Sequence, residues 1–287
     1  MTEPARDAGG AVRTREVELR RRAIRLRSSF ANRAQAGLGV LGILIILALW
    51  EMMPNVGIVN PLYLPPASDV LALFVIRLGD ILFWTSVWHT IQAWGLGLVI
   101  ATILGASLGF ALGLSRFLRE ATQSTVEFLR PVPSVALIPV AVLLFGTSIE
   151  SALLIIVYAC FWQVLIQVLY GVTDVDPVAL DTAKSYGFSP IDSLRFVVFP
   201  TALPFLFTGL RLASAISLIL AITAGLVIGT PGLGSDIALA RSGGAIEGLY
   251  ALVLATGLIG VVINVGFRQV EKRLLSWHTS SRKDSAT

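Results

Sequence analysis

Six long apolar stretches limit the possible folds of this chain more than any other feature. They lie at residues 34–53, 86–114, 121–146, 150–172, 203–229 and 247–268. A hydrocarbon core of ~30 Å needs about twenty helical residues, and each stretch is long enough to cross it. Lipid offers no hydrogen-bond partner to a backbone amide, so a spanning stretch must be helical. The mean hydropathy of +0.80 agrees with this. We therefore predict an all-α integral membrane protein with six transmembrane helices.

The basic residues are concentrated in alternate connecting segments. With the N-terminus in the cytoplasm, the inner segments hold nineteen of the 22 Lys and Arg residues, and nine of these precede residue 34. The outer segments 54–85 and 230–246 hold only Arg77 and Arg241. Basic flanks stay on the cytoplasmic side of a membrane. This bias predicts that both termini are cytoplasmic, and it explains the net charge of +4 without a nucleic-acid ligand.

The expected organisation has four parts. Residues 1–33 form a basic cytoplasmic tail, and residues 34–83 comprise the first span and an outer amphipathic helix. Residues 84–270 form a membrane core that includes a polar loop at 173–202, and residues 271–287 form a second cytoplasmic tail. The core and the first span are expected to contact membrane lipid.

The second predicted span contains regularly spaced small residues, and the third contains several prolines. Small residues recur at every fourth position of the second span: Gly97, Ala101, Gly105, Gly109 and Gly113. Such a ridge lets another helix approach closely. Three prolines, Pro131, Pro133 and Pro139, should kink the third span, because proline lacks a backbone donor. The kink can be simple geometry or part of a gate.

The sequence lacks the groups that catalysis, metal binding or proton pumping requires. Only two histidines and one cysteine, Cys160, are present, which is too few for the usual metal clusters. No carboxylate pair lies deep in a span to relay protons. No Gly-Lys pair is present to form a phosphate-binding loop. We predict no catalytic residue, metal or cofactor in this chain, so uphill transport would draw its energy from another chain.

The polar loop is predicted to contain two short helices. Asp176 and Pro177 suit the start of the first helix, which should run to Tyr186 and end at Gly187. Ser189 and Asp192 form a capping pattern at the start of the second. Pro200 is expected to stop that second helix just before the fifth span. The loop is then either a hairpin that rests on its own spans or a knob for a cytoplasmic partner.

The loop "DTAKSYGFSPIDSLRFVVFP" resembles the EAA loop of binding-protein-dependent ABC importer permeases. That pattern is Glu-Ala-Ala, three residues, Gly, nine residues, an aliphatic residue, one more, then Leu-Pro. Asp181, Thr182 and Ala183 stand at the EAA positions and Gly187 at the glycine. The closing positions hold Val197, Phe199 and Pro200. The resemblance implies that the first helix is a coupling helix, with six coupling residues: Asp181, Thr182, Ala183, Tyr186, Gly187 and Pro200.

Four further stretches resemble the nitrate, sulfonate and taurine branch of these permeases. They are "LPPASDV", "FLRPVPSVALIPVAVLLFG", "PTALPFLFTGLRLA" and "PGLGSDI". The resemblance implies the type I importer permease fold and a transporter of two permease copies and two ABC ATPase subunits. The ATPases would hold ATP and magnesium, and an extracytoplasmic solute-binding protein would deliver the solute.

One position departs from this branch, and a few polar residues interrupt the spans. Ala224 and Gly225 stand where the branch usually has Ala-Glu. The candidates for lining a translocation path are Arg211, Gln92, Gln163, Gln167 and Asn264. Arg211 would either attract an anionic solute or extend to the cytoplasmic surface.

The expected function is a permease subunit of an ATP-driven importer in the cell membrane. Its solute would be small and anionic, such as a sulfonate, nitrate or taurine. An ATP-independent channel or secondary carrier is the alternative, but neither needs a docking loop for an ATPase. A third class, a membrane-embedded enzyme, is disfavoured because the sequence offers no catalytic constellation.

The orientation can be tested by single-cysteine labelling in a background without Cys160. A membrane-impermeant thiol reagent added to intact cells should label Asp236→Cys and spare Lys184→Cys, because only the first position is predicted to lie outside. Labelling at position 184 in intact cells would overturn the predicted topology.

Overall fold

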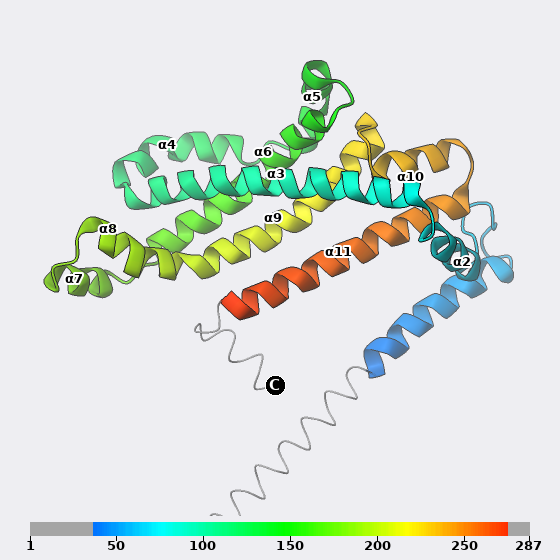
Figure 1. The fold of residues 1–287 in the computed structure, drawn as a ribbon, viewed down its shortest axis with the longest axis horizontal. Coiled ribbons are helices and arrows are strands. Elements are labelled where there is room, and N and C mark those ends of the chain that lie inside the picture. Colours follow the sequence, from blue (N-terminus) through cyan, green and yellow to red (C-terminus); the bar gives the residue numbers. More distant parts are fainter. Residues whose placement is uncertain (1–36, 275–287) are drawn as a thin grey trace, which may run out of the picture. The chain divides into compact units, whose positions relative to one another are not determined.

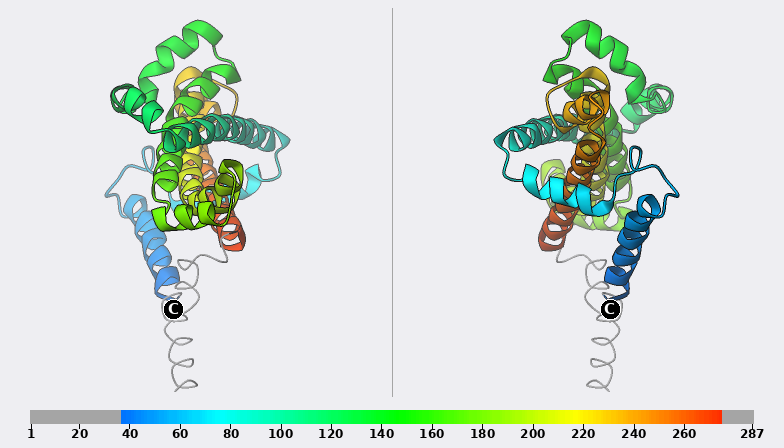
Figure 2. Two further views of the ribbon diagram at one scale, coloured as in Figure 1. Left: turned by 90° about the vertical axis from the view of Figure 1, so that its left-hand side faces the viewer. Right: turned by 90° about the vertical axis from the view of Figure 1, so that its right-hand side faces the viewer.

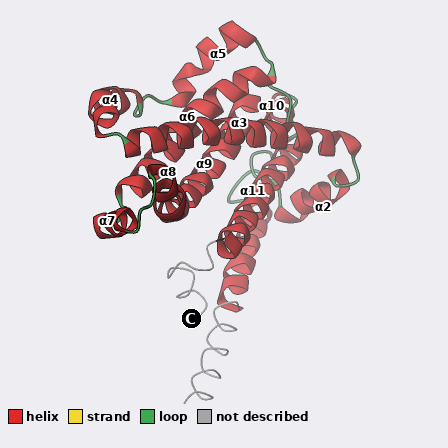
Figure 3. Ribbon diagram, turned by 60° about the vertical axis from the view of Figure 1, so that its left-hand side comes forward, coloured by secondary structure: helices red, strands yellow, loops and turns green. Residues whose placement is uncertain are grey.

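The computed structural model describes residues 37–274, and every regular element in that range is helical (Figure 3). The described residues fall into two compact units, which divide between Ser68 and Asp69. The predicted basic tail at 1–33 lies outside the described residues. So does most of the predicted tail at 271–287.

The first unit contains the helix Gly37–Asn55 and the turn that follows it. The carboxylate of Glu51 accepts hydrogen bonds from the N–H and the hydroxyl of Ser68, at 2.9 and 3.0 Å. The indole N–H of Trp50 donates to the carbonyl of Pro65 at 3.0 Å. These bonds hold the turn against the last residues of the helix.

The second unit is an assembly of helices joined by short connections (Figure 1). Its first elements are α2 (Ala67–Arg77, which begins at the unit boundary), α3 (Ile81–Leu114), α4 (Arg116–Leu129), η1 (Ser134–Leu137) and α5 (Ile138–Phe145). Its later elements are α6 (Ile149–Thr173), α7 (Pro177–Ser185), α8 (Pro190–Ser193), η2 (Leu194–Val198), α9 (Phe199–Ile228), α10 (Leu233–Ser242) and α11 (Ile246–Leu274).

Five continuous helices of the described chain are long and apolar enough to cross a membrane. They are Gly37–Asn55, α3, α6, the run Pro190–Ile228, and α11. A sixth span is present if α4 and the η1–α5 segment together form one broken span, since they are bent by 79°. The predicted kink is confirmed at this break, where Pro131 and Pro133 interrupt the helical hydrogen bonds.

The prediction that Pro200 ends a helix is wrong. Residues 190–228 form one helical run, in which α8 passes through the π-helical turn η2 into α9. In η2 the N–H of Phe199 donates to the carbonyl of Leu194, five residues back. This wider turn precedes Pro200 in the first turn of α9, where the missing backbone donor costs little.

The core of the second unit is the packing of α3, α6 and α9, which remain adjacent in three views (Figures 1 and 2). The small residues of α3 face α6, as predicted for a packing ridge. A Cβ atom on Gly105 would lie 2.8 Å from the carbonyl oxygen of Phe161, and one on Gly109 would lie 2.9 Å from that of Leu165. The two backbones therefore approach so closely that no side chain fits between them at these positions.

Hydrogen bonds also join α3 to later helices. The indole N–H of Trp94 donates to the carbonyl of Ser214 at 3.0 Å, and the hydroxyl of Ser217 donates to the carbonyl of Trp94 at 2.8 Å. The hydroxyl oxygen of Thr90 accepts from the N–H of Leu233 at 2.9 Å, which fixes the start of α10. Such bonds stabilise helix contacts where water is absent.

Gly225, the position where the related branch usually carries an acidic residue, lies at a tight crossing of α9 and α10. A Cβ atom there would lie 2.8 Å from the Cα of Gly234. A Cβ on Gly234 would in turn collide with the carbonyl of Ile222. The absence of an acidic side chain thus has a packing reason, because this crossing requires two glycines.

The α3–α6 contact predicts a difference between two Gly→Ala variants on the same helix. Gly105→Ala should destabilise the fold by about 1–3 kcal/mol, because its Cβ meets backbone that cannot move aside. Gly95→Ala is the control, since a Cβ there meets nothing within 4 Å, and it should be neutral or stabilising by up to about 1 kcal/mol. Thermal unfolding in detergent measures both. Equal melting temperatures for the two variants would contradict the packing.

Candidate functional site: the α7–α8 loop

The predicted coupling loop follows directly from the core. Three residues separate the end of α6 from the start of α7, and α7 contacts both α8 and η2. In Figure 1 the pair α7 and α8 lies at the same end of the second unit as the start of α4. The far end of this unit carries α10.

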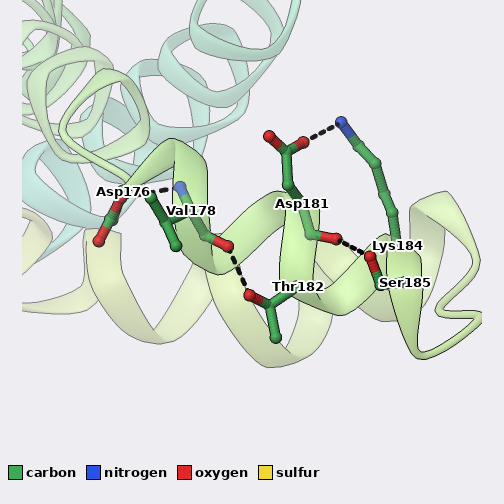
Figure 4. Close-up of polar contacts among 6 residues, drawn as sticks. All are labelled: Asp176, Val178, Asp181, Thr182, Lys184 and Ser185. Carbon is green, nitrogen blue, oxygen red and sulfur yellow. Dashed lines mark hydrogen bonds and ion pairs between the residues drawn. The ribbon is translucent and has the colours of Figure 1, made fainter.

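Local hydrogen bonds fix the start and the body of α7 (Figure 4). The carboxylate of Asp176 accepts from the N–H of Val178 at 2.8 Å, which confirms the predicted N-cap. The hydroxyl of Thr182 donates to the carbonyl of Val178 at 2.7 Å. Lys184 and Asp181 form an exposed ion pair at 3.0 Å. An exposed pair of this kind adds little stability, so the cap and the backbone bonds define the helix.

The end of α7 has the hydrogen-bond pattern of a Schellman motif. The N–H of Phe188 donates to the carbonyl of Ala183 at 3.0 Å, and that of Gly187 donates to the carbonyl of Lys184 at 2.9 Å. Gly187 has a φ of +79°, which glycine adopts without steric cost. The prediction that Gly187 ends this helix is confirmed, although the helix itself stops at Ser185, one residue earlier than predicted.

The second predicted cap is also present. The hydroxyl oxygen of Ser189 accepts from the N–H of Asp192 at 3.1 Å, and the carboxylate of Asp192 accepts from the N–H of Ser189 at 3.2 Å. This reciprocal capping box fixes the start of α8, whose N-cap lies two residues after Gly187. The turn between the two helices is therefore fixed from both sides.

The exposure of the loop side chains corrects one expectation. As predicted coupling residues, Ala183 and Tyr186 were both expected to face a partner, but Ala183 is only 7% exposed and is buried within this chain. Tyr186 is 81% exposed, and Val178 and Ile191 are 70% and 75% exposed. The outward surface of the loop is therefore apolar at these three positions, while Ala183 belongs to its internal packing.

Sequence reasoning did not single out Ile191 or Phe196. Phe196 is exposed and makes an edge-to-face contact with Phe188, with 6.1 Å between the ring centroids. The guanidinium of Arg195 lies over its ring. The available signal was the presence of large apolar residues inside an otherwise polar, capped loop. Exposed apolar groups in such a setting indicate a contact surface.

The predicted path residues lie on four different helices. Arg211 of α9 forms an ion pair with Glu271 of α11 at 3.4 Å, and the two side chains are 41% and 28% exposed. Neither alternative proposed for Arg211 included this partner. Gln163 and Gln167 are half-buried on α6, where Gln167 packs against Gly209 of α9, and Asn264 is exposed on α11.

Gln92 lines a pocket of about 540 Å³ at the end of the unit remote from α7. His89 of α3 and the residues around Ser148 at the start of α6 complete its walls. No group of three or more potential metal ligands occurs within residues 37–274.

Comparison with known proteins identifies the family. Residues 101–276 match the model of the binding-protein-dependent transport system inner membrane component. The chain belongs to this family. Its members are permease subunits of ABC importers, so the chain is a multi-pass inner-membrane permease. In these importers separate ATPase subunits hydrolyse the ATP that drives transport. Membership decides against the alternative of an ATP-independent channel or secondary carrier.

Individual relatives support the branch suggested by the sequence. The chain is 30% identical over 266 residues to the taurine transport system permease protein of Escherichia coli, covering 91% of this chain and 96% of the relative. It is 28% identical over 243 residues to a putative aliphatic sulfonates transport permease protein of Bacillus subtilis, with 84% and 88% covered.

A solved structure supports the fold. A bacterial ABC transporter involved in the import of the acidic polysaccharide alginate contains a chain that superposes with a TM-score of 0.59 at 15% identity. The superposition covers 87% of this chain and 99% of that one. The predicted type I importer permease fold is thus confirmed.

The Schellman motif predicts that Gly187→Val loosens the end of α7. A Cβ at this position meets nothing within 4 Å, so the cost is the positive φ alone, about 1–3 kcal/mol for a β-branched residue. Amide hydrogen exchange at residues 186–188 should accelerate by roughly 5- to 150-fold. Gly187→Asn is the control, because asparagine tolerates this conformation, and it should stay near the wild-type rate. Wild-type exchange in Gly187→Val would show that the motif does not hold the helix.

Proposed function

We propose that the α7–α8 loop is the surface through which this permease docks with its ATPase subunits. The observation that supports this proposal is that the loop, whose two helices each begin at a side-chain N-cap, presents three large apolar side chains outward. These are Val178, Tyr186 and Ile191. Covering exposed apolar groups with a partner favours binding. A loop that is already held in one conformation loses little conformational entropy when it docks.

The six predicted coupling residues divide into two roles under this proposal. Tyr186 would contact the ATPase directly. Thr182, Ala183 and Gly187 would support the contact by shaping α7, through the hydroxyl bond, the internal packing and the Schellman turn. Pro200 would act through the helix that carries α8, and Asp181 through its exposed position beside Lys184.

The proposed assembly has two copies of this permease and two ATPase subunits. ATP and magnesium would bind to the ATPases, and a solute-binding protein would deliver the solute on the opposite side of the membrane. The loop and both termini would be cytoplasmic, as the bias in basic residues suggests. Membrane lipid would surround the apolar outer faces of the spans.

The proposed solute is a small anion, with organic sulfonates as the leading class. Support comes from the two relatives, whose names refer to taurine and to aliphatic sulfonates. Aliphatic sulfonates are anions, and taurine carries a sulfonate together with an ammonium group, so the negatively charged sulfonate is the group that these solutes share. Nitrate stays within the same proposal through the resemblance of the sequence to that branch.

Charge substitutions on the outward surface of the loop test the docking proposal. Tyr186→Asp and Ile191→Asp should each reduce the ATPase retained in co-purification at least tenfold, about 1.4 kcal/mol, because each would bury an unpaired charge at the contact. Solute uptake into vesicles should fall in parallel. Both variants should still insert in the membrane, since no buried residue of the chain is changed.

Ile76→Asp is the matched control. Ile76 lies on α2 and is 70% exposed, close to the 75% of Ile191, so it tests the effect of the same apolar-to-acidic change away from the loop. This variant should retain wild-type ATPase binding. If the two loop variants also retain wild-type binding and transport, the loop is a surface hairpin and the proposal fails.

A further inference from the structure

A groove of about 730 Å³ lies beside α4, outside the loop and the path residues discussed above. One wall is α4, and the other is formed by the last turns of α3 and α6. Since α7 follows the end of α6, the groove is at the same end of the second unit as the α7–α8 loop.

The charged side chains of this groove come from α4 and the residue that ends it, and they include the carboxylates of Glu120 and Glu127. Arg119, Gln123, Glu127 and Arg130 are spaced by four, four and three residues, and all of them line the groove. This spacing places them on one side of a helix. No residue of α4 is buried, so the face is open to a ligand.

The charges on this face are unevenly paired. Glu120 forms an ion pair with Arg116 at 2.7 Å, and the carboxylate of Glu127 accepts a hydrogen bond from the amide of Gln123 at 2.9 Å. Neither Arg119 nor Arg130 has an ion pair within the described part of the chain. Both arginines line the groove, and Arg119 is half-buried while Arg130 is exposed.

The opposite wall strengthens the attraction for an anion. It is largely apolar, with Leu112, Ile166 and Leu169, and it ends in the exposed Tyr170. Apolar walls exclude water and so increase the strength of a charge–charge interaction. A guanidinium group presents paired N–H donors that match the oxygens of a sulfonate, sulfate, phosphate or carboxylate.

We infer that this groove binds an oxyanion group through Arg119 and Arg130. Two sources can supply the group at this end of the permease. One is the anionic group of the solute as it leaves the path, and this source rests on the proposed function. The other is the phosphate of a phospholipid headgroup, which does not.

Thiol protection measures occupancy of the groove without relying on transport. Val126→Cys places a thiol in the groove and leaves its polar groups unchanged. Cys160→Ser removes the native thiol while keeping a donor to the carbonyl of Ala213. The rate of reaction with a neutral maleimide is measured on the full permease–ATPase complex in an uncharged detergent. The probes are sodium ethanesulfonate and sodium sulfate, compared with sodium chloride at matched ionic strength. A second arm uses nanodiscs with and without phosphatidylglycerol.

Protection of at least threefold by ethanesulfonate or sulfate assigns the groove to the solute's anionic group. Protection only by phosphatidylglycerol assigns it to a lipid headgroup. In either case Arg119→Gln and Arg130→Gln should each weaken the protection, and Glu127→Gln should increase it by removing a negative charge. No protection by any probe, or full protection in the double variant Arg119→Gln/Arg130→Gln, overturns the inference. Failure of ATPase docking with intact protection would reject the proposed function alone.

Discussion

The direct approach of the α3 and α6 backbones is the contact on which the rest of the second unit depends. Inside a bilayer, neighbouring helices gain little from the hydrophobic effect, so their association relies on close packing and on hydrogen bonds. Glycines on α3 bring backbone against backbone, and Trp94 and Ser217 add hydrogen bonds between α3 and α9. Because α6 leads within three residues into α7, this packing also fixes the base of the α7–α8 loop.

The helical run from Pro190 to Ile228 links that loop to the opposite end of the unit. The run contains 39 residues, which corresponds to roughly 58 Å at 1.5 Å per residue. At one end is the capping box of α8, and at the other is the glycine crossing with α10. The chain therefore has no non-helical break between the loop and this crossing. The π-helical turn at 194–198 allows this continuity beside Pro200.

The sequence predicted the features that depend on local chemistry or on helical periodicity. The Asp176 cap, the Gly187 turn, the Ser189–Asp192 box, the small-residue ridge and the kink near Pro131 were all accessible in this way. Features that depend on tertiary contacts were not. The burial of Ala183, the partner of Arg211 and the packing role of Gly225 each depend on a second helix whose position the sequence does not give. The prediction that Pro200 ends a helix was wrong because a π-helical turn has no simple sequence signature.

Site-specific photocrosslinking in a purified complex that hydrolyses ATP tests the central claim most directly. A photoreactive phenylalanine analogue at position 186 should crosslink to the ATPase subunit, since Tyr186 is the most exposed of the three apolar loop residues. The same analogue at position 76, on α2, should give no crosslink to the ATPase. A fully active complex in which position 186 crosslinks only to lipid or to this chain, and never to the ATPase, would contradict the account.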